Sequence, residues 1–368
     1  MPNRALKLFV FSFLVLGFGF PVLFAEPAPG NRVQLTLDAS EADQVLAILK
    51  LSAGSKPVDD SQWQRLFATE PYQGLKKREA EIGQRFHDPT LALTDDGFKK
   101  FVLSDDLRDR VGELSSTLDT WKKADLQASA DRALAYLPAS ATIRAKVYAM
   151  IKPNSNSFVW GPASDRAVFL YLDPGTSRAK FENTVAHEMH HIGLGSLGPV
   201  YDQKIAALPE LARAAADWMG SFGEGLAMLA AAGGPDVDPH AASTAKEHAR
   251  WEHDMANFNR DLRAVNGFLS DTLSGKFPNR DAIDEKGSSF FGAQGPWYTV
   301  GYKMAVTVEK RFGRTVLIET MLDPRCLLVL YNQTASEQNA AGKERLALWS
   351  DSVLAGVAAP SCIGAPKS

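Results

Sequence analysis

Hydrophobic positions along this chain recur mostly with the spacing of amphipathic helices, and only a few short runs alternate as strands do. Before residue 138, one brief alternation at 33–37 is followed by consecutive helical patterns. Strand patterns then gather between residues 142 and 172, and helical patterns dominate the rest of the chain. We therefore predict an α+β fold that is predominantly helical, with one small mixed or antiparallel sheet. The later predicted strands are 142–151, 158–160 and 167–172. The predicted helices include 60–69, 71–86, 94–102, 105–137 (broken near 124), 209–232, 240–273, 297–312 and 346–357. Residues 271–294 are expected to form a long loop.

The same patterns divide the chain into three parts. Residues 1–25 have the layout of a secretory signal, with basic residues before an apolar run and a cleavage site expected after Ala25. Left uncleaved, this run borders on the length of about 20 residues that spans a bilayer and would act as an anchor. Residues 26–138 are expected to be an N-terminal helical region, and residues 139–368 a second region that joins the later strands to C-terminal helices.

Charge and cysteine content narrow the location and partners. The formal net charge is −3 and no basic stripe is present, so nucleic acid is not an expected partner. The signal pattern predicts an exported protein, periplasmic or secreted, that meets the membrane only through this segment if it is uncleaved. The two cysteines, Cys326 and Cys362, either pair in an oxidising compartment and fasten the C-terminal tail, or remain buried free thiols.

The strongest chemical signal is the pentapeptide His187-Glu188-Met189-His190-His191, which reads His-Glu-x-x-His inside a helical pattern. Two histidines four residues apart lie on one helix face, one turn apart, because the helix repeats every ~3.6 residues. His187 and His191 can therefore share one zinc ion, beside which Glu188 would act as a general base. His190 points away from this face, so we expect it to support a ligand or to lie on the surface rather than to bind metal.

A catalytic zinc site usually has three protein ligands and one open position, so a third ligand must come from elsewhere. Two glutamates have suitable spacing: Glu210 lies 19 residues after His191, and Glu224 lies 33 residues after it. Glu210 stands at the expected start of its helix, where a carboxylate commonly interacts with the helix dipole. Glu224 is expected deep within the predicted helix, and its small neighbours Gly223 and Gly225 would let the zinc helix come close. We favour Glu224.

With Glu224 as third ligand, the chain resembles the gluzincin peptidases, in which His-Glu-x-x-His is followed by a Glu on a later helix. A metzincin is excluded because Leu194 and Leu197 stand where that class has Gly and His. Over roughly residues 140–335 the chain is also similar to a group of uncharacterised bacterial exported proteins described as zinc-dependent peptidases. In that group Gly-Glu-Gly and a Tyr-x-x-Gly-Tyr helix follow the zinc helix, as in Tyr298-Thr-Val-Gly-Tyr302 here.

The resemblance implies that residues 139–368 form a zincin-like catalytic domain with C-terminal helices, which binds one Zn²⁺ through His187, His191 and Glu224 and cleaves peptide or protein substrates. The chain lacks the Gly-x-x-Glu-Asn signature with which zinc aminopeptidases hold a free amino terminus. Tyr298 and Tyr302, four residues apart on one helix face, are candidate donors to the oxyanion of the transition state; the alternative is that they are half-buried packing aromatics.

Two other functions compete with a peptidase: a zinc hydrolase of another amide, such as a cell-wall peptide, and a non-catalytic envelope protein in which zinc braces two helices. The presence of Glu188 favours an enzyme, because a structural zinc site usually closes with Cys or His and needs no base.

Overall fold

The computed structural model describes residues 32–85, 87–162, 165–342, 344–358 and 362. The predicted secretory segment, 1–25, lies outside the described residues. The chain forms two compact units, one made of residues 33–129 and 143–188 and the other of residues 130–142 and the described residues from 189 onward. These units interleave along the chain, whereas the sequence patterns suggested a boundary at residue 138. Strand pairing explains the difference, because the strand β1 (Val33–Asp38) pairs with β2 (Ile143–Met150) and so joins residues 33–129 to the later strands.

The first unit is built on a four-stranded mixed sheet with the strand order β1-β2-β4-β3. Neighbouring strands β1, β2 and β4 are parallel, and the short edge strand β3 runs antiparallel to β4. The mixed sheet within a mostly helical chain confirms the predicted fold class. The strands are β1 (Val33–Asp38), β2 (Ile143–Met150), β3 (Phe158–Trp160) and β4 (Arg166–Tyr171).

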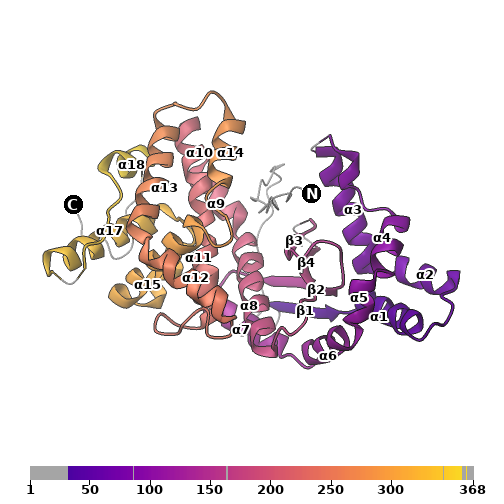
Figure 1. Cartoon of the computed structure of the whole chain (residues 1–368). Coiled ribbons are helices and arrows are strands. Elements are labelled where there is room, and N and C mark those ends of the chain that lie inside the picture. Colours follow the sequence, from indigo (N-terminus) through magenta and orange to yellow (C-terminus); the bar gives the residue numbers. More distant parts are fainter. Residues whose placement is uncertain (1–31, 86, 163–164, 343, 359–361, 363–368) are drawn as a thin grey trace. The chain divides into compact units, whose positions relative to one another are not determined.

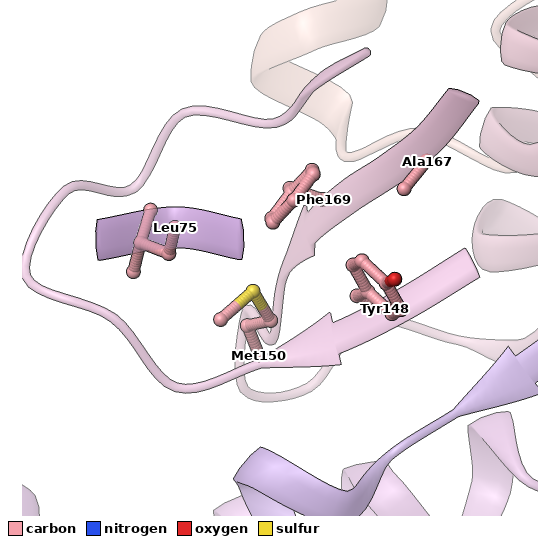
Figure 2. Packing of buried hydrophobic residues seen from close by; sticks show 5 residues of the cluster. All are labelled: Leu75, Tyr148, Met150, Ala167 and Phe169. Atoms are coloured by element: carbon pink, nitrogen blue, oxygen red, sulfur yellow. The ribbon is translucent and has the colours of Figure 1, made fainter. Parts of the chain in front are cut away.

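Helices follow β1 and cover this sheet. Leu75 of α3 packs against side chains of β2 and β4, including Met150 and Phe169 (Figure 2). The helix approaches closely because Gly74 has no side chain: a Cβ there would lie 2.9 Å from Cζ of Phe169. The helices of this part are α1 (Ser40–Ala53), α2 (Asp60–Phe67), α3 (Glu70–Arg85), η1 (Pro89–Leu91), α4 (Asp95–Val102), α5 (Asp105–Asp109), α6 (Val111–Trp121) and α7 (Leu126–Leu134), the last of which continues into the second unit.

The helix α8 (Arg178–Gly195) follows β4 and contributes its first part to the sheet-containing unit and its second part to the helical unit. In the helical unit, α15 packs against α11, α12, α13, α16 and α17, most of which are labelled in Figure 1. Trp297 of α15 is completely buried. The helices after α8 are α9 (Gly198–Ile205), α10 (Glu210–Met219), η2 (Gly220–Phe222), α11 (Gly223–Ala232), α12 (Ala245–Ala256), α13 (Phe258–Leu273), α14 (Arg280–Ser288), α15 (Pro296–Phe312), α16 (Arg314–Thr320), α17 (Arg325–Ala340) and α18 (Asp351–Gly356).

The helix expected at 240–273 is divided into α12 and α13, and the helix expected at 346–357 begins only at Asp351. Two other local predictions were also wrong. The expected loop at 271–294 contains α14, which begins where the side chain of Asn279 accepts a hydrogen bond from the amide of Ala282 and which buries Ile283. The expected continuous helix at 209–232 is divided by the 3₁₀ segment η2. Both differences arise from short-range backbone geometry that a hydrophobic pattern does not report.

A disulfide resolves the alternatives for the cysteines. Cys326 and Cys362 are bonded, with their Cα atoms 5.5 Å apart, so the end of the chain is tied to the start of α17. Among the described residues, no helix combines the length and the hydropathy needed to cross a bilayer.

Candidate metal centre

The helix α8 is fixed in place by one apolar face. Ser177 caps its start, since its Oγ accepts a hydrogen bond from the amide of Lys180 at 3.2 Å. Phe181 is buried and stacks on Trp121 with ring centroids 4.3 Å apart, and Val185 is completely buried below it. The helix is therefore capped by a hydroxyl at its start and held by an apolar face.

The other face carries the candidate metal ligands. His187, His191 and Glu224 each offer one ligand atom, and these three atoms all lie within 4.8 Å of one another. Within the described part of the chain this is the one group of at least three His, Cys, Asp or Glu residues so arranged. Nε2 of His191 lies 3.1 Å from Oε2 of Glu224.

The donor set fits zinc. Two nitrogen donors and one carboxylate leave one of the four tetrahedral positions for water or substrate, as catalytic zinc requires. Ligand atoms at about 2.1 Å from zinc in a tetrahedron lie about 3.4 Å apart, close to the His191–Glu224 separation. The side chains of His191 and Glu224 are only 14% and 15% exposed, which shields the charges from water without sealing the site.

Glu224 reaches this position from the first turn of α11, as the second residue of that helix. The prediction that it lies deep within one long helix is therefore wrong, because η2 separates α10 from α11. The other candidate, Glu210, is exposed in the first turn of α10 and does not belong to the cluster.

The two glycines beside Glu224 have different neighbours. A Cβ on Gly223 would lie 3.1 Å from Cδ2 of Leu194 on α8, so Gly223 does face the zinc helix, as expected. A Cβ on Gly225 would lie 2.6 Å from the carbonyl oxygen of Tyr298, and closer still to the amide of Tyr302, both on α15. The expectation that Gly225 also serves the approach to the zinc helix is wrong.

Glu188 and His190, which also belong to the motif, differ in burial. Glu188, next to His187 on α8, is partly buried, so it remains accessible to a water molecule. His190 is completely buried, which excludes the surface location considered for it. It is not part of the ligand cluster.

The two candidate tyrosines lie on α15, one turn apart. Tyr302 is buried, its ring packs edge-on to Trp251, and its hydroxyl donates to the carbonyl of Val237 at 3.5 Å. Burial, reinforced by the nearby negative charges of Asp238 and Asp236, raises the pKa of Tyr302 to about 12. Tyr298 is partly buried. Donation to a reacting oxyanion by either tyrosine stays a prediction.

Sequence reasoning missed the part played by Gly301. A Cβ on Gly301 would lie 2.6 Å from the carbonyl oxygen of Phe222, directly before α11. The glycine of the Tyr-x-x-Gly-Tyr motif thus marks a close crossing of α11 and α15. The motif contains this glycine, but α11, the helix that the glycine packs against, lies far away in the sequence.

Comparison with known proteins adds one match. The model of a family described as "Putative zinc dependent peptidase (DUF5700)" matches residues 63–340, which is more than half of the chain and includes all three candidate ligands. No curated protein and no solved structure matches the chain.

Proposed function

The chain belongs to the DUF5700 family, and on that premise we propose that it is a gluzincin-type peptidase that holds one Zn²⁺ between His187, His191 and Glu224. The observation that carries the proposal is the convergence of two imidazoles and a remote carboxylate, with ligand atoms within 4.8 Å of one another. The substrates are peptides or proteins.

The reaction assigned to this site is hydrolysis of a peptide bond by water. Zinc, when bound, polarises the substrate carbonyl and makes water a nucleophile near neutral pH. Glu188 takes a proton from the attacking water and delivers it to the leaving nitrogen. Tyr298 or Tyr302 donates a hydrogen bond to the oxygen that becomes negative in the transition state.

Two substitutions separate catalysis from metal binding. Glu188→Gln removes the base but no ligand, so zinc content should stay near one ion per chain while peptide or casein cleavage falls by at least about 10²-fold. His187→Ala removes a ligand, so zinc content and cleavage should both be lost. Glu210→Gln, at the exposed glutamate outside the cluster, is the matched control and should keep both. Full activity in Glu188→Gln, or cleavage without zinc, would rule the proposal out.

We also propose that the protein is exported. The Cys326–Cys362 disulfide supports this, because disulfides persist in oxidising compartments and are rare in the cytosol. Intact-mass measurement on the protein recovered outside the cytoplasm tests the proposal: cleavage after Ala25 gives a chain beginning at Glu26. A full-length mass in the membrane fraction would support the uncleaved anchor instead, and recovery in the cytosol would contradict export.

A further inference from the structure

The helix that carries Glu224 is held on two sides where it begins. On one side, α11 crosses α15 at Gly225 and Gly301. A Cβ added to Gly301 would lie 3.3 Å from Cα of Gly225. On the other side, Gly223 faces Leu194 of α8. Glu224 stands between these two contacts in the sequence.

The two contacts differ in how much change they tolerate. An added Cβ at Gly225 or Gly301 would overlap backbone atoms of the opposite helix, which cannot rotate away. The helices would have to separate by roughly 1 Å to restore ordinary contact distances. An added Cβ at Gly223 would meet only the flexible end of the Leu194 side chain.

A shift of that size matters at the metal. Zinc–ligand distances must lie within about 0.2 Å of their ordinary values. The Glu224 carboxylate lies 3.1 Å from the His191 ring nitrogen, and α11 brings it there from its first turn. Movement of the start of α11 therefore moves the third ligand away from the two histidines, which belong to α8.

We infer that Gly225, Gly301 and Gly223 are positioning residues for zinc binding: Gly225 and Gly301 set the place of α11 on α15, and Gly223 sets its distance from α8. This inference rests on the proposed function, because it needs zinc at the His187–His191–Glu224 cluster. The inference goes beyond the proposed function because it states that three residues without a ligand atom control how tightly the site binds zinc.

The test measures zinc affinity by competition with a fluorescent chelator, using the full chain and checking folding by circular dichroism. Gly225→Ala and Gly301→Ala should each weaken zinc binding about 10- to 100-fold, the range seen when groups that orient metal ligands are lost. Gly301→Ala is the more telling of the two, because it lies on a helix without any ligand. Gly223→Ala should fold and weaken binding measurably, though by less than about 10-fold, and adding Leu194→Ala should restore the affinity; an unchanged affinity in Gly223→Ala would contradict the role of Gly223.

Two controls separate positioning from general destabilisation. Gly267→Ala, on α13, introduces a Cβ with no heavy atom within 4 Å, and zinc affinity should not change. Leu269→Ala opens a cavity at a completely buried position of α13 and should lower stability without lowering zinc affinity.

The outcomes are distinguishable. If the wild-type chain binds zinc and His187→Ala does not, but the folded glycine variants bind as tightly as wild type, the positioning inference is wrong and the proposed function stands. If Leu269→Ala weakens binding as much as the glycine variants do, the inference is also wrong. If Gly225→Ala and Gly301→Ala do not fold, Gly223→Ala and its rescue by Leu194→Ala decide the question. A wild-type chain that binds no zinc would overturn both proposals.

Discussion

Nε2 of His191 and Oε2 of Glu224 lie 3.1 Å apart, although 33 residues separate them in the chain. Both side chains are mostly buried. The two atoms already have the separation that neighbouring ligands of one zinc ion need, so little rearrangement is required for binding.

Glu224→Gln should lower zinc affinity by at least about 100-fold, more than the loss of an outer group that orients a ligand. The amide keeps the shape of the side chain, but it replaces one acceptor oxygen with an NH2 donor and loses the negative charge that favours a divalent cation. Isothermal titration with zinc measures the effect. The same substitution at exposed Glu210 should leave the affinity unchanged; the reverse pattern would make Glu210 the third ligand.

The disulfide should contribute about 3–4 kcal/mol to the free energy of unfolding, because it closes a loop over a sequence separation of 36 residues in the unfolded chain. Cys326→Ser with Cys362→Ser should lower the denaturant midpoint accordingly. Under reducing conditions the wild-type and the double variant should unfold at nearly the same concentration. A midpoint in the double variant equal to that of the oxidised wild type would show that the bond does not stabilise the fold.

A buried ion pair holds the same region. Arg325 donates to both carboxylate oxygens of Asp323, at 2.8 and 2.7 Å, and also to the carbonyls of Val357 and Ala358 at 3.2 Å. Asp323→Asn leaves a buried guanidinium without its counter-charge, so unfolding free energy should fall by about 3 kcal/mol.

The surface pair of Lys310 and Asp236 is the comparison for this substitution. Its aspartate side chain is 82% exposed, and Asp236→Asn should cost less than about 1 kcal/mol because water screens the pair. Chemical denaturation of both variants measures the difference. Equal costs would show that burial does not control the strength of these pairs.

Glu41 makes stability depend on pH. Its carboxyl is completely buried, and Oε2 accepts a hydrogen bond from the amide of Ile151 at 2.9 Å. Burial raises the pKa of Glu41 from its usual 4.5 to about 8, although the Ile151 amide and the charge of Lys152 act in the opposite direction. Between these pH values the folded state binds more protons than the unfolded state, so stability falls as pH rises; below pH 4.5 the carboxyl adds no slope.

The clearest window is pH 5 to 7. Burial lowers the pKa of Lys152 to about 7, so this lysine is mostly protonated in both states up to about pH 6 and adds an opposing slope only as the pH approaches 7. Glu41→Gln should remove a slope of up to about 1.4 kcal/mol per pH unit from the unfolding free energy in this window. Denaturation at pH 5, 6 and 7 measures it, with Glu210→Gln as the exposed control. An unchanged slope in Glu41→Gln would show that the buried carboxyl does not titrate there.

Local signals in the sequence were sufficient for the helix of the motif. The spacing of His187 and His191, the apolar face through Val185 and the cap at Ser177 all depend on residues within about two turns, and helix geometry alone relates them. The later strands of the sheet were predictable for a similar reason, since short β-favouring runs bounded by turns need no knowledge of distant residues. The pattern left open whether the sheet is mixed or antiparallel, because strand direction depends on which strands pair. The choice of Glu224 over Glu210 came from spacing and small neighbours, and the cluster contains the residue that was chosen.

The sequence by itself determined which side chains can serve as ligands and which helix presents the two histidines, because these properties follow from residue type and a helical period. Only the tertiary structure decided that α11 begins at Gly223, that Gly225 packs on α15 through Gly301, and that β1 joins the later strands. These contacts connect segments far apart in the chain. Their distances depend on how whole helices and strands pack, and no local pattern of hydrophobic and polar residues encodes that packing.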